Sequence, residues 1–298
     1  MFSITMNAHA WLFEDGYSVA NLLATSGPFG LFFSLVNTMR ILTGILNRIE
    51  RIRWGRAAAA YYRSCEQKSE ELARRYAEHT VSGGDLKPFG QGSAAYYVDQ
   101  SLLSDSPLAY SFGVGCDITF DLDLIDRTNA TVYAFDPTDE AASFLGTQTI
   151  PKSFHFMQVG VADEDGEAEI QDIKPGSQTY RPATLLDIGK ANGITKISTR
   201  TFKSLADELG HQRIDVMKLD IEGGEYKVVA TLSDDFKPAK QIAMEYHPYL
   251  VNLRDGKPMD HDHGWKVTTD SIESLIKLGY RLTHISERGT EISFRLQD

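Results

Sequence analysis

Residues 214–225 read Ile-Asp-Val-Met-Lys-Leu-Asp-Ile-Glu-Gly-Gly-Glu, a mostly apolar run that leads into an acidic turn. The turn carries Asp220, Glu222 and Glu225. A short apolar run bounded by glycines is typical of a buried strand, and α/β proteins bind ligands at the carboxyl ends of their parallel strands. We therefore expect a strand over Ile214–Asp220 with its acids in a ligand site.

Strand-like and helix-like segments alternate on both sides of this stretch. The other expected strands are Leu108–Phe112, Thr131–Asp136, Phe154–Val159 and Gln241–Tyr246, and the expected helices are Phe120–Arg127, Asp139–Leu145, Phe202–Leu209 and Gly224–Leu232. Such alternation indicates an α/β fold, a parallel sheet with helices on both faces. Near the end, a helix over Asp270–Leu278 precedes Tyr280–Ile285 and Glu291–Leu296, which predict a closing antiparallel hairpin.

Composition excludes several classes of protein. The chain has 298 residues, of which 42% are hydrophobic and 24% charged, and this is ordinary globular usage. A net charge of −11 disfavours a nucleic-acid partner, because an acidic body repels phosphates. Cys65 and Cys116 cannot form a disulfide framework and show no zinc spacing. The absence of a disulfide framework favours a reducing compartment, so we expect a cytoplasmic protein.

The charge distribution suggests two parts. Residues 1–90 carry a net charge of +2 and residues 91–298 one of −13. We interpret the first part as a helical N-terminal extension and the second as the α/β domain. Within the extension, a second helix is expected near Ala57–His79, and Pro88–Gly92 reads as a linker.

An uncharged run in the extension raises the question of a membrane. Gly27-Pro28 interrupts it, so an amphipathic helix beginning just after Pro28 fits better than a span. Three uses of residues 29–56 stay open: packing on the domain or on a second copy in a homodimer, peripheral contact with an anionic membrane, or a membrane anchor. A cleaved signal peptide is not expected, since the basic residues follow the apolar run.

Two glycines and two acids suggest a nucleoside cofactor. Gly113 and Gly115 follow the first strand, where they allow a tight turn, and Asp136 ends the second strand, where its carboxylate can accept ribose hydroxyls. A nicotinamide fingerprint requires a third glycine where Ile118 stands. The carboxylate of Asp117 would repel a pyrophosphate but suits a cationic sulfonium. The pattern favours S-adenosylmethionine over NAD.

These motifs resemble those of the FkbM-like S-adenosylmethionine-dependent methyltransferases. Leu209–Glu225 matches the family phrase L-G-H-x-x-I-D-V-x-K-x-D-I-E-G-x-E, and Glu245–His247 matches E-x-H. Tyr110–Gly113 matches the opening Y-S-F-G of one branch, and Phe156–Asp163 is similar to the third-strand segment. The resemblance covers roughly residues 95–298. It implies a class I (Rossmann-like) methyltransferase fold with a seven-stranded, mostly parallel sheet, and methyl transfer that is typically to a hydroxyl oxygen.

Site residues follow from the same resemblance. It implies that the cofactor is bound by Gly113, Gly115, Asp117, Asp136, Val161, Asp163, Asp220 and Glu222. The last two would lie at the reacting end, and the Val161–Asp163 turn would lie near the adenine. Asp136 stands where relatives often have Glu, which keeps the charge but shortens the reach.

A hydroxyl acceptor must lose its proton, so a base within hydrogen-bond reach would help. His247 is the first candidate because its ordinary pKa lies near neutrality, and Glu245, Asp220 and Glu222 are alternatives. His247 could instead be a purely structural histidine. The acids Asp220, Glu222 and Glu225 could also bind Mg²⁺, which prefers oxygen ligands; this metal is not favoured.

The expected partner is a small molecule with a hydroxyl group; sugars, polyketides and lipids stay open. The main rival is a catalytically inert binding module of the same fold, because fold alone does not assign activity. An NAD-dependent oxidoreductase is a second rival, and methylation of protein or nucleic acid a third.

Overall fold

The computed structural model describes residues 64–172, 183–187, 193–233, 239–251, 253–254, 257–258 and 261–297. The chain divides into two units, Met1–Arg63 and Ser64–Asp298, and all of the described residues belong to the second. The helix expected over residues 29–56 lies outside the described residues, so its use stays a prediction. Among the helices in the described ranges, none is both long and apolar enough to cross a membrane.

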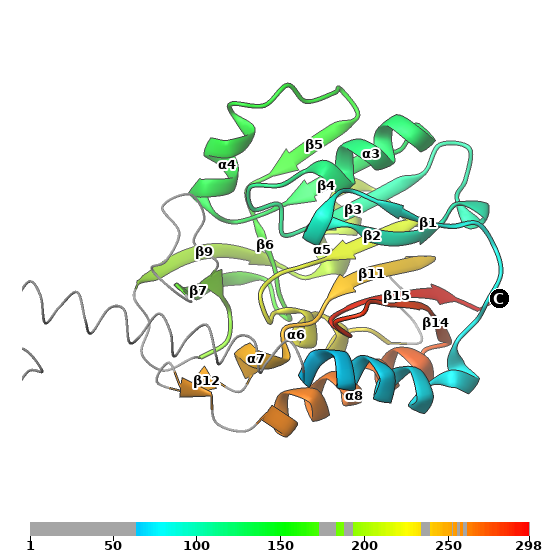
Figure 1. Ribbon diagram of the computed structural model, residues 1–298. Coiled ribbons are helices and arrows are strands. Elements are labelled where there is room, and N and C mark those ends of the chain that lie inside the picture. Colours follow the sequence, from blue (N-terminus) through cyan, green and yellow to red (C-terminus); the bar gives the residue numbers. More distant parts are fainter. Residues whose placement is uncertain are drawn as a thin grey trace, which may run out of the picture. The chain divides into compact units, whose positions relative to one another are not determined.

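A seven-stranded sheet forms the centre of the second unit (Figure 1), in the order β14-β15-β11-β10-β3-β4-β5. Its strands are β3 (Leu108–Phe112), β4 (Thr131–Phe135), β5 (Phe154–Met157), β10 (Val216–Leu219), β11 (Gln241–Glu245), β14 (Tyr280–Ile285) and β15 (Glu291–Leu296). β10 pairs in parallel with β3 and β11, and β4 pairs in parallel with β3 and β5. β15 is antiparallel to β11 and β14. The expected class I fold with its closing antiparallel hairpin is confirmed.

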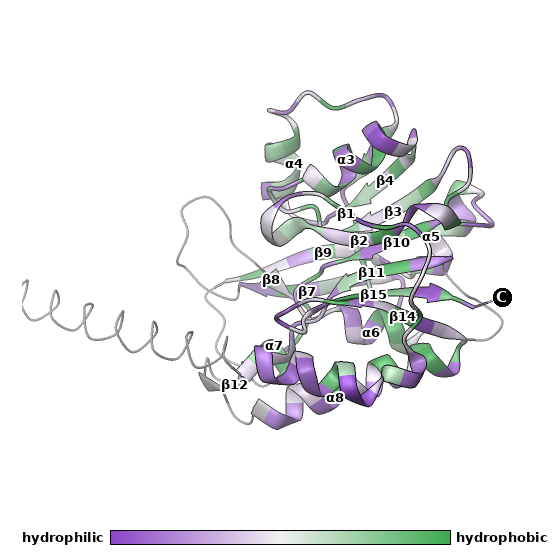
Figure 2. Cartoon of the chain, turned by 45° about the vertical axis from the view of Figure 1, so that its right-hand side comes forward, coloured by the Kyte–Doolittle hydropathy of each residue, from purple (hydrophilic) through white to green (hydrophobic). Residues whose placement is uncertain are grey.

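Helices cover both faces because successive side chains of a strand point to opposite faces. The helices are α3 (Thr119–Thr128), α4 (Asp139–Leu145), α5 (Phe202–Leu209), α6 (Glu225–Ala230), α7 (Pro248–Val251) and α8 (His261–Lys277). Phe120 of α3 packs in one buried cluster with Val132 and Ala134 of β4. On the opposite face, the ring of Phe202 in α5 lies 5.5 Å from that of Tyr110 in β3. Figure 2 shows that the central strands of the sheet are largely hydrophobic.

Local signals set the ends of these helices. The Thr138 hydroxyl accepts the N–H of Ala141 and starts α4, and the Thr201 hydroxyl accepts the N–H of Ser204 and starts α5. Gly210 ends α5 in the left-handed conformation, at φ +71°. These boundaries therefore agree with the predicted ones.

Several small elements have no counterpart in the sequence prediction. A second sheet has the order β6-β9-β7-β8, and two hairpins pair β1 with β2 and β12 with β13. Their bounds are β1 (Leu86–Phe89), β2 (Tyr96–Asp99), β6 (Gly160–Val161), β7 (Gly166–Asp172), β8 (Ala183–Thr184), β9 (Ile194–Arg200), β12 (Leu253–Arg254) and β13 (Lys257–Pro258), and short 3-10 turns occupy Ala77–His79, Gly92–Ala94 and Gln100–Leu102. The linker expected at Pro88–Gly92 is thus partly the strand β1.

The second unit begins before residue 91. A helix over residues 64–75 lies against α8, where Arg75 pairs with Glu273 at 2.6 Å. The Ser69 hydroxyl donates to the carbonyl of Ser286 beside the β14–β15 hairpin, at 2.6 Å. Residues 64–90, which the sequence assigned to the extension, therefore pack on the α/β domain.

Helix α8 begins at His261, nine residues before the expected start at Asp270. Gly264 lies in its first turn, where a glycine weakens the helical signal in the sequence. Trp265, Thr268 and Ile272 follow at helical spacing and are buried, so packing stabilises the turns that propensity alone does not predict.

Candidate active site

The sequence-predicted acids meet at the carboxyl edge of four adjacent strands. β3, β4 and β10 are followed by Gly113, Asp136 and Asp220, and β11 ends at Glu245, two residues before His247. Because these strands are parallel neighbours, their carboxyl ends lie at one edge of the sheet. This edge is where an α/β sheet binds its ligand.

The turn after β3 requires glycine at position 113. Gly113 has φ +81°, and a Cβ atom added there would lie 1.6 Å from the carbonyl oxygen of Asp220. Its N–H donates to the carbonyl of Phe135 at 3.0 Å. The first glycine of the predicted motif thus allows the ends of β3 and β10 to approach closely.

Asp136 binds this turn through its carboxylate. One oxygen, Oδ2, accepts the N–H groups of Val114 and Gly115, both at 2.9 Å. The other, Oδ1, accepts the N–H and the hydroxyl of Thr138, at 2.9 and 2.5 Å. A carboxylate has about four acceptor positions, and all are used here. The predicted role of Asp136 in holding a ribose is untested. To accept hydrogen bonds from ribose hydroxyls, Asp136 would have to give up some of these four hydrogen bonds.

Three other predicted cofactor residues lie around this edge. Asp117 accepts the N–H of Thr119 at 2.8 Å at the start of α3. Val161 is buried in β6, and the Asp163 carboxylate lies 3.8 Å from the Nζ of Lys227 in α6. These contacts neither confirm nor exclude the roles expected for the three residues.

Asp220 is held by two partners that the sequence analysis did not assign to it. Its Oδ2 accepts the hydroxyl of Tyr96 at 2.9 Å and lies 3.4 Å from the Nζ of Lys218. Burial raises the pKa of Asp220, but Lys218, His247 and the Tyr96 hydroxyl outweigh it and hold that pKa below its ordinary value. Asp220 is therefore a carboxylate at neutral pH.

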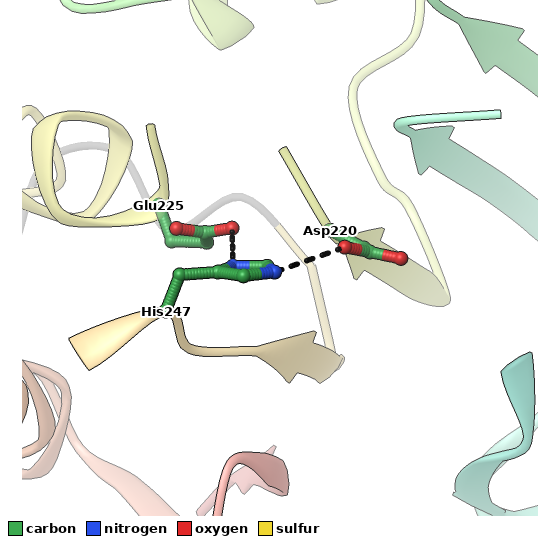
Figure 3. A group of neighbouring side chains, drawn as sticks. All are labelled: Asp220, Glu225 and His247. Carbon is green, nitrogen blue, oxygen red and sulfur yellow. Dashed lines mark hydrogen bonds and ion pairs between the residues drawn. The ribbon is translucent and has the colours of Figure 1, made fainter. Parts of the chain in front are cut away.

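His247 lies between carboxylates (Figure 3). Its Nδ1 is 2.9 Å from Oε1 of Glu225, while its Nε2 is 3.5 Å from Oε2 of Glu222 and 3.8 Å from Oδ1 of Asp220. The side chain of Glu225 is fully buried, and that of His247 is only 6% exposed. The sequence analysis considered Glu225 only as a possible metal ligand. In the structure, its carboxylate instead contacts the imidazole of His247.

The site contains more acidic than basic side chains. Burial lowers the pKa of His247, but the carboxylates of Glu225, Glu222 and Glu245 outweigh it and raise that pKa well above its ordinary value. Burial, together with the charge of Asp220, raises the pKa of Glu222 to about 7 and that of Glu245 to about 8. Glu222 and Glu245 are therefore partly protonated and neutral at pH 7. A cation bound beside them would favour their ionised forms.

Two carboxylate oxygens in the site have no hydrogen-bond partner among the described residues. They are Oε2 of Glu222 and Oε2 of Glu225. Asp220, Glu225 and His247 each also place one atom within 4.8 Å of the others, a spacing that could hold a metal ion. A buried acceptor without a hydrogen bond costs stability. These two oxygens therefore suit a cationic ligand, either a metal ion or a sulfonium.

A family model decides what the chain is. The model described as the methyltransferase FkbM domain matches residues 117–282. The chain belongs to the FkbM methyltransferase family. The match includes the Asp220 turn and the Glu245–His247 segment, so the candidate site lies inside the FkbM domain.

Two curated proteins are similar to part of this chain. Human "Probable methyltransferase-like protein 24" is 27% identical over 141 residues, 46% of this chain and 32% of the human protein. The rat protein of that name is also 27% identical over 141 residues. This similarity supports the assignment to the FkbM-like methyltransferases. This FkbM chain matches about a third of the length of those relatives.

Solved structures are more distant. A fibrillarin pre-rRNA processing protein from Methanococcus jannaschii has 12% identity and a TM-score of 0.35, covering 72% of this chain and 86% of that one. A methyltransferase from Pyrococcus furiosus has 13% identity and a TM-score of 0.30, covering 65% and 76%. The class I assignment of this FkbM domain therefore rests on its own sheet order.

Sequence reasoning missed Tyr96 and Lys218. Lys218 carried a signal, since a lysine whose neighbours Met217 and Leu219 are both apolar is unusual in a fully buried strand. Tyr96 carried none, because it lies 124 residues from the Asp220 that it contacts, in a segment of glycines, alanines and tyrosines.

Proposed function

We propose that this chain catalyses S-adenosylmethionine-dependent methylation of a hydroxyl group on a small molecule. One observation carries the proposal: four carboxyl groups surround the His247 imidazole at the carboxyl edge of the sheet, next to the Gly113 turn. They belong to Asp220, Glu222, Glu225 and Glu245. A surplus of buried carboxylate fits the cationic methionine end of S-adenosylmethionine. It does not fit the pyrophosphate of a nicotinamide cofactor.

Each group has a distinct part in the proposal. Asp220 and Glu222 would lie at the reacting end of the cofactor, and Asp136 would hold the ribose once its contacts with the Val114 and Gly115 amides are partly exchanged. S-adenosylmethionine, when bound, supplies a methyl group activated by its sulfonium. The protein then has to align the acceptor oxygen and remove its proton.

His247 is the proposed base. Its Nδ1 is engaged by Glu225, and its Nε2 faces Asp220 and Glu222 at the edge where the acceptor would arrive. Because the surrounding carboxylates raise the pKa of His247, the neutral imidazole accumulates on the alkaline side of neutrality. We therefore expect methyl transfer to accelerate as the pH rises above 7.

Calorimetric titration of the full chain with S-adenosylhomocysteine tests the cofactor, with NAD⁺ as the control and Mg²⁺ either present or absent. Saturable binding of S-adenosylhomocysteine alone supports the proposal, and binding of NAD⁺ alone contradicts it. A requirement for Mg²⁺ would assign Asp220, Glu225 and His247 to a metal.

Transfer of a labelled methyl group to a panel of sugars, polyketides and lipids then tests the reaction. His247→Ala should reduce turnover about 100-fold and leave the affinity for S-adenosylhomocysteine nearly unchanged. The exposed His155, substituted by alanine in the same way, is the control and should leave both unchanged. Binding without transfer to any acceptor would favour the inert module.

A further inference from the structure

The contacts of Glu225 give it a role of its own. It begins α6, directly after the acidic turn, and its side chain is fully buried. Its Oε1 accepts the backbone N–H of Ile221 at 2.9 Å and lies 2.9 Å from Nδ1 of His247. One oxygen atom thus joins the turn after β10 to the segment after β11.

The shared oxygen decides which ring nitrogen of His247 carries a proton. An oxygen that accepts the Ile221 N–H is an acceptor toward Nδ1 as well, so Nδ1 is the donor. In the neutral ring the lone pair then belongs to Nε2, because a histidine carries only one N–H in that state. The contact with Glu225 therefore selects the tautomer.

Nε2 is available for chemistry. The nearest carboxylate oxygens, on Glu222 and Asp220, are 3.5 and 3.8 Å away, and that of Glu222 makes no hydrogen bond with any residue that the structure describes. Nε2 thus lies at the strand edge between two acids, at distances that leave it free to accept a proton from another group.

We infer that Glu225 is the positioning residue of His247: it fixes the ring in the Nδ1–H tautomer and presents Nε2 to the hydroxyl of the methyl acceptor. The inference rests on the proposed function. When the acceptor O–H bond breaks, Nε2 binds the proton, and the electron pair left on oxygen forms the new bond to the methyl carbon as the carbon–sulfur bond breaks. Glu225 itself neither gains nor loses a proton.

Two substitutions separate the charge of Glu225 from its hydrogen bond. Glu225→Gln keeps an oxygen that can accept both N–H groups but removes the charge, so the pKa of His247 should fall and the acid limb of the pH–rate profile should move to lower pH. Glu225→Ala removes the contact, and turnover should fall roughly 100-fold, close to the loss in His247→Ala. In the double variant, the second substitution should cost less than about threefold, because residues that act as a unit are not additive.

NMR of histidine labelled with ¹⁵N tests positioning without cofactor or acceptor. At a pH above its titration midpoint, His247 of the full-length wild type should be the Nδ1–H tautomer, and Glu225→Gln should lower that midpoint. Asp215→Asn is the matched control, since Asp215 is a buried acid paired with Lys240 at the opposite end of β10. It should leave the resonances of His247 unchanged.

Either of two results would overturn the inference. One is an Nε2–H tautomer in the wild type; the other is a His247 titration that Glu225→Gln leaves in place. The isosteric glutamine keeps the test open even where Glu225→Ala does not fold. Failure of the proposed function looks different, because the protein would then bind no S-adenosylhomocysteine or transfer no methyl group while the tautomer and its response to Glu225→Gln persisted.

Discussion

The Nζ of Lys218 lies 2.5 Å from the carbonyl oxygen of Gly113. The same ammonium group is 3.4 Å from Oδ2 of Asp220, and its side chain is only 7% exposed. One buried cation therefore ties the glycine turn after β3 to the acidic turn after β10. A strand with four buried residues tolerates this lysine because both partners lie at its carboxyl end.

Replacing Lys218 by methionine should destabilise the protein by about 2–4 kcal/mol, since removal of one partner leaves buried polar groups uncompensated. The Tyr96 hydroxyl would still donate a hydrogen bond to Asp220 in this variant. The loss in the free energy of unfolding should therefore be smaller than the largest losses seen when a buried ion pair is broken. Urea unfolding measures the difference.

Lys266→Met is the control for this substitution. Lys266 pairs with Asp270 at 2.5 Å, but its side chain is 69% exposed, so the expected change is within about 0.5 kcal/mol. Equal losses in the two variants would show that the contacts of Lys218 contribute no more than a surface ion pair.

Gly113→Ala should be severe, because the new Cβ would lie 1.6 Å from the carbonyl oxygen of Asp220. The turn would have to move, and we expect a loss of about 3–5 kcal/mol together with loss of S-adenosylhomocysteine binding. Gly210→Ala provides the comparison: φ there is +71°, and nothing lies within 4 Å of the added carbon. It should cost only the left-handed conformation, about 1–2 kcal/mol. Similar unfolding midpoints for the two variants would contradict the close approach.

The sequence predicted the central sheet well, because the burial that selects each strand is local. The predicted bounds of β3, β14 and β15 agree with the structure residue for residue. The strands β7 and β9 escaped prediction because both are largely exposed and alternate polar side chains such as Glu167, Glu169 and Lys196. Their hydrophobic signal is weak, and pairing with each other stabilises them.

The candidate site was predicted only in part, for a similar reason. Its acids follow strands, so their positions could be read from the chain. Their partners could not be, because Tyr96 and Glu225 reach Asp220 and His247 through tertiary contacts between distant segments. The direction of the His247 ring depends on such a contact, and no spacing rule in the sequence contains it.

Binding of S-adenosylmethionine should release protons. Burial raises the pKa of Glu222 to about 7 and that of Glu245 to about 8, so both are partly protonated at neutral pH. A sulfonium beside them favours the ionised forms, and affinity should therefore increase as the pH rises from about 6 to 8, by at most tenfold per pH unit for each proton released. Calorimetry in two buffers of different ionisation enthalpy counts the protons.

S-adenosylhomocysteine is the control ligand, because its sulfur is neutral and should release fewer protons. Glu245→Gln should reduce the number released with S-adenosylmethionine. Identical proton counts for the two ligands would show that Glu222 and Glu245 lie away from the sulfonium.

The amino-terminal limit of the folded domain is a final prediction. A chain of residues 64–298 should unfold cooperatively, because it keeps the helix over residues 64–75 and the β1–β2 hairpin. A chain of residues 91–298 loses β1 and with it Phe89, which is fully buried in the core cluster. Loss of a buried phenylalanine alone costs about 3–5 kcal/mol, and β2, which carries Tyr96, would lose its pairing partner.

We expect the shorter chain to aggregate or to unfold without a sharp transition, while Phe89→Ala in the longer chain gives an intermediate loss of stability. Thermal unfolding followed by circular dichroism measures all three, and equal midpoints for the two chains would place the domain boundary at residue 91 after all.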